Sequence, residues 1–244
     1  MDSLPALPAI APATLRDVVR RVTQQELATV SDKEIIPLTG GFSGAHVYRL
    51  AGTAQADGGS VPWALVLKVL HADLARDDPA GWDYWKREAL LYASGLLDEL
   101  PGGLRAPRCF LVGECPPDTI CLWLEALDAP VATPWTSDQY STAARSLGRF
   151  NGAFLAGRPV PSAPWLPSSC LRLHVEARAT AVAMLAAQHA HPLVRTVWPT
   201  ANIAGVLRLW GERDLLLAAF DRLPRPSSTV TRPLATWWSS RATL

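Results

Sequence analysis

Three glycines and a serine interrupt an apolar stretch in the first fifth of the chain. The segment Gly40-Gly41-Phe42-Ser43-Gly44 follows apolar residues at 35–38 and precedes another apolar stretch that begins at Val47. Glycine tolerates positive φ and leaves room for a ligand to approach the backbone. A third apolar stretch, 61–70, carries a single lysine, Lys68, and a lysine in such a setting is costly unless it meets an anion. A Gly/Ser loop above a strand-borne cation is suited to holding phosphates. On these residues alone, a purely structural hairpin is an equal alternative.

An acidic residue lies where it could meet that lysine. The segment 81–92 has helical periodicity, and one flank of it holds Trp85, Glu88, Ala89, Leu91 and Tyr92. An acid on an inward flank usually has a basic partner. We therefore expect Glu88 to pair with Lys68. A plain structural ion pair remains the alternative.

Composition bounds the possible classes of protein. The chain has 244 residues, 49% of them apolar, and a formal net charge of +1. A sizeable core is available, and nothing draws the whole chain towards nucleic acid or a membrane. No signal peptide and no membrane span are recognisable, so we expect a cytoplasmic protein. Cys115 and Cys121 could meet across a hairpin, but the expected cytoplasmic setting favours reduced thiols.

The chain changes character near residue 129. Before it we expect a helix over 14–28 with a capping box at Thr14–Asp17, strands over 33–38, 47–50 and 61–70, the helix at 81–92, and strands over 107–115 and 118–127. After it we expect helices over about 136–156, 169–190, 200–210 and 212–222, with a capping box of Thr136 and Gln139 at the start of the first. This predicts an α+β fold with an N-terminal lobe of strands and helices at 1–129 and a helical lobe at 130–244.

Five segments in this order resemble the protein-kinase-like fold, and in particular the aminoglycoside phosphotransferase and choline-kinase-like group of small-molecule kinases. They are the glycine segment 40–44, the strand 66–68, the helix residue Glu88, the stretch 124–127 and the helix 144–152. Each motif is weak alone, and their order and spacing carry the resemblance. It spans roughly residues 35–223. It implies a two-lobed fold with a nucleotide-binding antiparallel sheet lobe at 1–129 and an incomplete helical lobe at 130–244.

The resemblance also implies roles for named residues. Backbone amides of Gly40, Gly41, Phe42 and Gly44, with the hydroxyl of Ser43, would hold the phosphates of ATP or GTP. Lys68 would bind phosphate oxygens, oriented by Glu88. The backbones of Glu125 and Leu127 would hydrogen-bond the adenine edge. Full members of the family use Mg²⁺ and phosphorylate a small hydroxylated acceptor, which this sequence does not identify.

The catalytic loop of that family does not follow the last predicted helix. The family places a His-Gly-Asp loop there, with an Asn five residues after the Asp. This chain has no acidic residue after Asp221, so we assign neither catalytic nor metal-binding residues. Codons taken one frame over are compatible with apolar-His-Gly-Asp and an Asn five residues later. We therefore expect 225–244 to be an out-of-frame tail. A natural short C-terminus is the alternative.

Three functions follow for the chain as it stands. It could be a phosphotransferase, a non-catalytic nucleotide-binding or interaction module of the pseudokinase kind, or an inactive truncation product with exposed apolar surface. His189 and His191 lie two residues apart near a predicted helix end, where a solvated helix terminus is favoured over a metal site.

Overall fold

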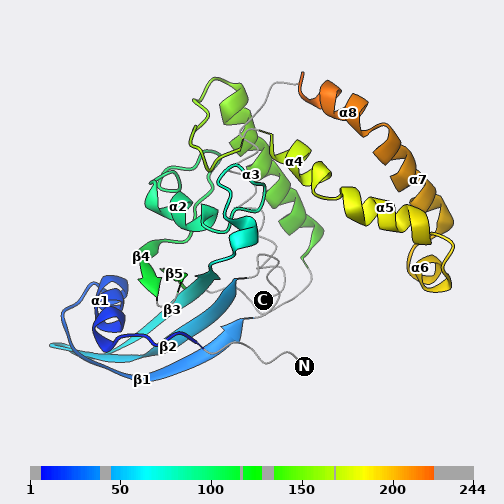
Figure 1. Cartoon of the computed structure of the whole chain (residues 1–244). Helices are drawn as coiled ribbons and strands as arrows, with labels where there is room; N and C mark the ends of the chain where they lie inside the picture. Colours follow the sequence, from blue (N-terminus) through cyan, green and yellow to red (C-terminus); the bar gives the residue numbers. More distant parts are fainter. Residues whose placement is uncertain (1–6, 39–44, 116–117, 128–134, 168, 223–244) are drawn as a thin grey trace.

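The computed structural model describes residues 7–38, 45–115, 118–127, 135–167 and 169–222 (Figure 1). The glycine segment Gly40–Gly44 and the predicted out-of-frame tail, 225–244, lie outside these residues. The described chain is an α+β protein, with an N-terminal antiparallel sheet followed by helices.

Five strands form one antiparallel sheet with the order β1-β2-β3-β5-β4. Their bounds are β1 Leu27–Leu38, β2 His46–Ala56, β3 Gly59–His71, β4 Cys109–Cys115 and β5 Thr119–Glu125. The predicted strands are confirmed, but β1 to β3 are longer than expected. The polar stretch 52–60 continues the β2–β3 ladder almost to its end, since Ala56 still pairs with Gly59. Gly59 has φ of 116°, which explains the glycine at this tight turn.

Successive side chains of β3 point to opposite faces of the sheet, and a different helix covers each face. Leu65, Leu67 and Val69 are fully buried on the face covered by α1 (Pro12–Thr23). The intervening residues lie on the opposite face, where α2 (Arg87–Ala93) packs through Ala89. A short 3₁₀ helix at Leu74–Arg76 begins the connection between β3 and α2.

The first helix differs from its predicted bounds. It begins at Pro12, whose missing N–H suits the first helical position, and no side-chain capping bond forms at Ala11. It ends at Thr23 because Gln24 takes a left-handed conformation with φ of 56° and donates its N–H to the Arg20 carbonyl. The predicted capping box at Thr14 and the extension to residue 28 are therefore wrong.

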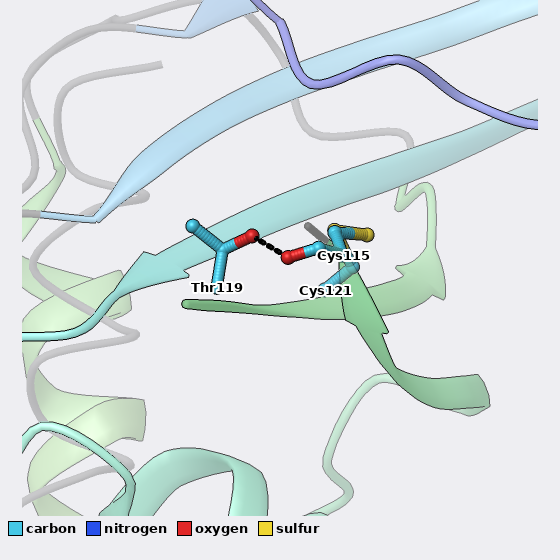
Figure 2. Close-up of a disulfide and its surroundings, with 3 residues drawn as sticks. All are labelled: Cys115, Thr119 and Cys121. Atoms are coloured by element: carbon cyan, nitrogen blue, oxygen red, sulfur yellow. Dashed lines mark hydrogen bonds between the residues drawn. A yellow bond between two sulfur atoms is a disulfide. The ribbon is translucent and has the colours of Figure 1, made fainter. Parts of the chain in front are cut away.

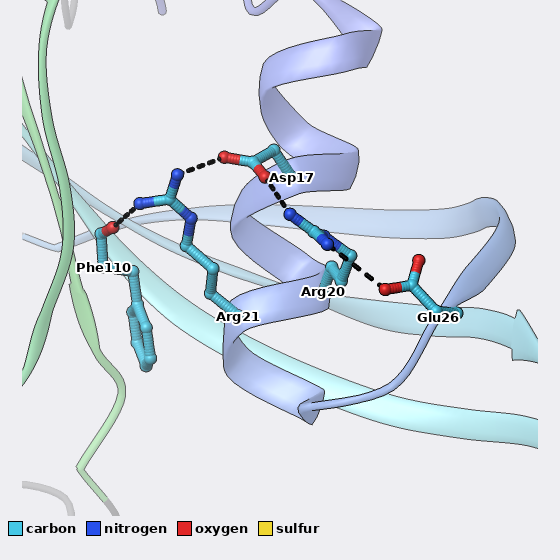
Figure 3. Close-up of polar contacts among 5 residues, drawn as sticks. All are labelled: Asp17, Arg20, Arg21, Glu26 and Phe110. Carbon is cyan, nitrogen blue, oxygen red and sulfur yellow. Dashed lines mark hydrogen bonds and ion pairs between the residues drawn. The ribbon is translucent and has the colours of Figure 1, made fainter.

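Charged side chains attach α1 to its surroundings (Figure 3). Asp17 pairs with Arg20 at 3.0 Å and with Arg21 at 2.7 Å. Arg21 also donates to the Phe110 carbonyl of β4 at 2.7 Å, and Arg20 reaches Glu26 at 3.2 Å. The hydrogen bond from Arg20 lowers the pKa of the Asp17 carboxyl. Of these contacts, the bond from Arg21 joins the helix to β4.

Cys115 and Cys121 form a disulfide between β4 and β5, with their Cα atoms 6.0 Å apart (Figure 2). The expectation of reduced thiols is therefore wrong. The two residues lie on adjacent antiparallel strands, two rungs of the ladder from each other, within disulfide reach. Thr119 donates its hydroxyl to the Cys115 carbonyl across the same turn. The disulfide and this bond close the β4–β5 hairpin.

Reduction of this disulfide is expected to lower the free energy of unfolding by about 2 kcal/mol, because the bond closes a loop of only a few residues in the unfolded chain. Urea denaturation with and without a phosphine reductant measures the loss. The Cys115→Ser variant should unfold near the reduced wild type and should not respond to reductant. Equal wild-type midpoints, with reduction confirmed by mass, would contradict the expectation.

The described residues after the sheet form six helices. They are α3 Ser137–Leu155, α4 Cys170–Glu176, α5 Ala179–Gln188, α6 Pro192–Val197, α7 Thr200–Gly211 and α8 Arg213–Phe220. The capping box of Thr136 and Gln139 is confirmed at the start of α3. The single helix expected over 169–190 is broken. The Arg178 N–H bonds to the Val175 carbonyl three residues earlier, and this tightened turn redirects the chain.

Helices α4 to α8 are sparsely packed. Figure 1 shows α5 and α7 running side by side, away from the sheet. Among the described residues of α4 to α8, only Ile203 and Leu217 are buried hydrophobics. Large apolar side chains stay exposed on these helices, including Met184, Leu193, Val197, Leu209, Leu215 and Phe220. Few buried contacts imply that these helices open before the sheet does. None of the helices in the described segments has the length and apolarity to cross a bilayer.

Candidate functional site

Lys68 lies in the middle of the sheet, on the face that α2 covers. Its rung of the ladder joins it to Val47 of β2 and to Leu122 of β5. Directly opposed residues share a face, so the fully buried Leu122 is a close neighbour of the lysine stem. Burial of the stem against apolar side chains positions the amine at the surface of this cluster.

The Lys68 amine meets Glu88 as predicted. Their Nζ and Oε2 atoms are 2.6 Å apart, with side chains only 10% and 21% exposed. Removing two charges from water is expensive, so a largely buried ion pair is weak evidence of a stabilising role. An ammonium group has three donors, and Glu88 uses one of them in this geometry. The remaining donors suit the oxygens of an anionic ligand.

Glu88 comes from the first turn of a helix that is shorter than predicted. The segment 81–92 was expected to be helical throughout, but α2 begins only at Arg87. The preceding residues form turns, with the Gly81 N–H bonded to Asp78 and the Trp85 N–H bonded to Arg76. A carboxylate in the first turn is favoured by the helix dipole. Trp85 lies outside the helix and still packs on the same apolar cluster as Ala89.

Leu38, the last described residue before the glycine segment, lies in the same row of the sheet as Lys68. Leu38 of β1 pairs with Val47 of β2, and Val47 pairs with Lys68 of β3. The three residues therefore form one row across the sheet, and β1 ends in that row. Neighbouring strands lie about 4.8 Å apart, so the Leu38 backbone lies roughly 10 Å from the Lys68 backbone. The phosphate-binding role of Gly40, Gly41, Phe42, Ser43 and Gly44 itself stays a prediction.

The stretch expected to contact adenine begins at the end of β5. Glu125 ends β5, and its N–H donates to the Arg108 carbonyl at 2.8 Å. This N–H is therefore not a donor for a ligand, because the β4 side of the sheet already uses it. The Glu125 carboxylate accepts from the guanidinium of Arg105 and from the Arg108 N–H at 3.0 Å. Roles for the Glu125 carbonyl and for Leu127, two residues beyond the strand, stay predictions.

No protein-family model, no curated protein and no solved structure matches this chain. The candidate site therefore depends on the geometry of its own residues.

A histidine pair formed by the start of β2 and the end of β3 was not predicted. His46 Nδ1 and His71 Nε2 are 2.7 Å apart, so one imidazole donates to the other. The rings meet edge to face, with centroids 4.7 Å apart. The signal available in the sequence was one histidine at the start of one strand and another at the end of its antiparallel neighbour.

This pair predicts a pH dependence of stability. Burial, followed by the nearby His46, lowers the pKa of His71 below its ordinary 6.5. The unfolded chain then binds the proton more readily, so stability is fully present above about pH 6.5 and is lost as the pH falls below it. Urea midpoints measured between pH 7.5 and pH 5 should fall more for the wild type than for His71→Gln. Parallel pH profiles would contradict this origin.

A magnesium site is not found among the residues that the structure describes. No group of three or more His, Cys, Asp or Glu side chains in these segments could hold a metal ion.

His191 accepts the Leu193 N–H at 3.3 Å and so caps α6. Asp221, the last acidic residue, pairs with Arg172 at 2.7 Å.

Proposed function

We propose that this chain binds a nucleoside triphosphate, ATP or GTP, on the sheet face that carries Lys68 and Glu88. The observation that carries the proposal is the ion pair of 2.6 Å between these two residues, set into an apolar face of the sheet. Protein kinases bind nucleotide phosphates with a lysine amine that is paired with a glutamate carboxylate. The fold we propose is the kinase-like two-lobed one, in the aminoglycoside phosphotransferase and choline-kinase-like group.

The order of elements supports the proposal. Three strands, then α2 with its carboxylate, then two more strands precede the helices, as the resemblance implies. The lysine is on the third strand and the glutamate on the next helix. Leu38, the last described residue before the glycine segment, shares a row of the sheet with Val47 and Lys68. This row, the strand that carries Lys68 and the helix that carries Glu88 all support a phosphate site on this face.

The proposal concerns binding. Phosphoryl transfer to a small hydroxylated molecule is the activity that the resemblance implies, and it needs a carboxylate that orients the acceptor hydroxyl and ligands for Mg²⁺. We assign no residue to these roles and derive no step through a metal. A non-catalytic nucleotide-binding module is therefore the function that the described residues support best.

Equilibrium titration with a fluorescent ATP analogue tests the proposal. We expect saturable binding to the purified 244-residue chain, displaced by unlabelled ATP or GTP, measured with and without Mg²⁺. Turnover in the same sample would favour a phosphotransferase. The absence of saturable binding to a chain that unfolds cooperatively would contradict the proposal. A chain that does not unfold cooperatively would instead match the inactive truncation product.

A further inference from the structure

Arg87, the residue next to Glu88, is a buried cation that donates hydrogen bonds to several backbone carbonyls. It is 9% exposed, and a charge so buried needs several hydrogen bonds. Its guanidinium donates to the carbonyl oxygens of Pro79, Gly81, Trp82 and Trp165. The bond from Nε to Trp165 measures 2.7 Å and that from Nη1 to Trp82 measures 2.9 Å.

These acceptors come from two separate parts of the chain. Residues 79–82 form the turns directly before α2, whereas Trp165 lies between α3 and α4. The Trp82 side chain adds a second connection. Its ring meets the His174 ring of α4 edge to face at 5.0 Å, and the Arg178 guanidinium lies 5.5 Å from it. The turns before α2 are thus tied to the helical part of the molecule.

The position of Arg87 does not serve the helix itself. A cation in the first turn opposes the helix dipole, and the preceding Lys86 makes no side-chain capping bond. A helix of seven residues has little stability of its own and depends on tertiary contacts for its placement. The rigid five-donor fork of arginine is suited to supplying such contacts.

We propose that Arg87 is a positioning residue that holds Glu88 against Lys68 and couples this ion pair to the helical part of the chain. Without the Arg87 guanidinium, the hydrogen bond between the start of α2 and the Trp165 carbonyl is lost. We then expect the ion pair between Glu88 and Lys68 to be broken for part of the time. The consequence for ligand affinity rests on the proposed nucleotide binding. The consequence for the ion pair does not.

Amine acylation read out by peptide mass tests the ion pair directly. The chain has three lysines, Lys33, Lys68 and Lys86, so each site is resolved. In the wild type, Lys68 should react slowly relative to the exposed Lys33. In Arg87→Ala the relative labelling of Lys68 should rise roughly tenfold, equivalent to about 1.4 kcal/mol of easier opening. Arg145→Ala, on the exposed face of α3, is the matched control and should not change it.

Lys68 labelling within twofold of the wild type in folded Arg87→Ala would overturn the proposal. If that variant does not unfold cooperatively, Arg87→Lys replaces it. This variant keeps the charge but loses the fork, and a rise of about threefold is expected. Unchanged labelling would again overturn the proposal. Nucleotide titration of the same proteins is a separate readout, because failure of the wild type to bind nucleotide contradicts the proposed function and leaves the labelling result intact.

Discussion

Replacing Glu88 with leucine is expected to lower the free energy of unfolding by about 3 kcal/mol, because it leaves the Lys68 ammonium buried without its carboxylate. Lys68→Met should cost less, about 1 to 2 kcal/mol, because Glu88 is the more exposed partner and keeps more contact with water. The double variant Lys68→Met/Glu88→Leu should lie within about 1 kcal/mol of the wild type, since an apolar pair can replace a buried ion pair without loss.

Urea denaturation of the four proteins measures the coupling between the two positions. We expect the double variant to be more stable than the sum of the single changes by about 2 kcal/mol or more. Lys33→Met removes an exposed lysine of the same sheet and should change stability by less than about 0.5 kcal/mol. Additive losses at 68 and 88 would contradict the account of a desolvated, interacting pair.

The same double variant is expected to lose nucleotide affinity while it keeps its fold. Hydrogen bonds to a charged group contribute roughly 1.5 to 3 kcal/mol, so the affinity should fall by about 10-fold to 150-fold. Because the double variant is expected to be about as stable as the wild type, a loss of affinity would reflect the missing ion pair and not partial unfolding.

Competition with the fluorescent analogue measures this loss. Lys33→Met again serves as the control and should bind like the wild type. A folded double variant with wild-type affinity would show that the nucleotide does not contact Lys68. Weakened binding in the control by the same factor would point to a nonspecific charge effect.

The parts of the structure that the sequence predicted depend on strong local patterns. The apolar stretch 61–70 predicted a strand with a single lysine, Lys68, and helical spacing around 85–92 placed Glu88 on an inward flank. A lysine in an apolar strand and an acid on an inward flank each need a partner of opposite charge, and the contact between them is confirmed. The capping box at Thr136 was predictable for the same reason, since both of its residues lie within one turn.

The features that were missed depend on tertiary contacts or on single backbone conformations. Gln24 ends α1 by taking a left-handed conformation, and a glutamine at this position does not predict that conformation. Reduced thiols were expected at Cys115 and Cys121 because the protein was expected to be cytoplasmic. In the folded hairpin the two residues are close enough to form a disulfide. The acceptors of Arg87 lie up to 78 residues away and are backbone carbonyls, which no side-chain pattern reveals. The hydrogen bond from the Glu125 N–H to the Arg108 carbonyl was also missed, because it joins the end of β5 to the residue before β4.

The contact between the Lys68 amine and a nucleotide is most directly measured by NMR of protein labelled only in its lysines. Three lysines give three side-chain signals, and Lys68→Met identifies the one of interest. On titration with ATP and Mg²⁺, we predict a saturable shift of the Lys68 signal while that of the exposed Lys33 stays in place. Saturable binding that leaves the Lys68 signal unmoved, or a Lys68 signal typical of a freely solvated amine before any nucleotide is added, would contradict the account.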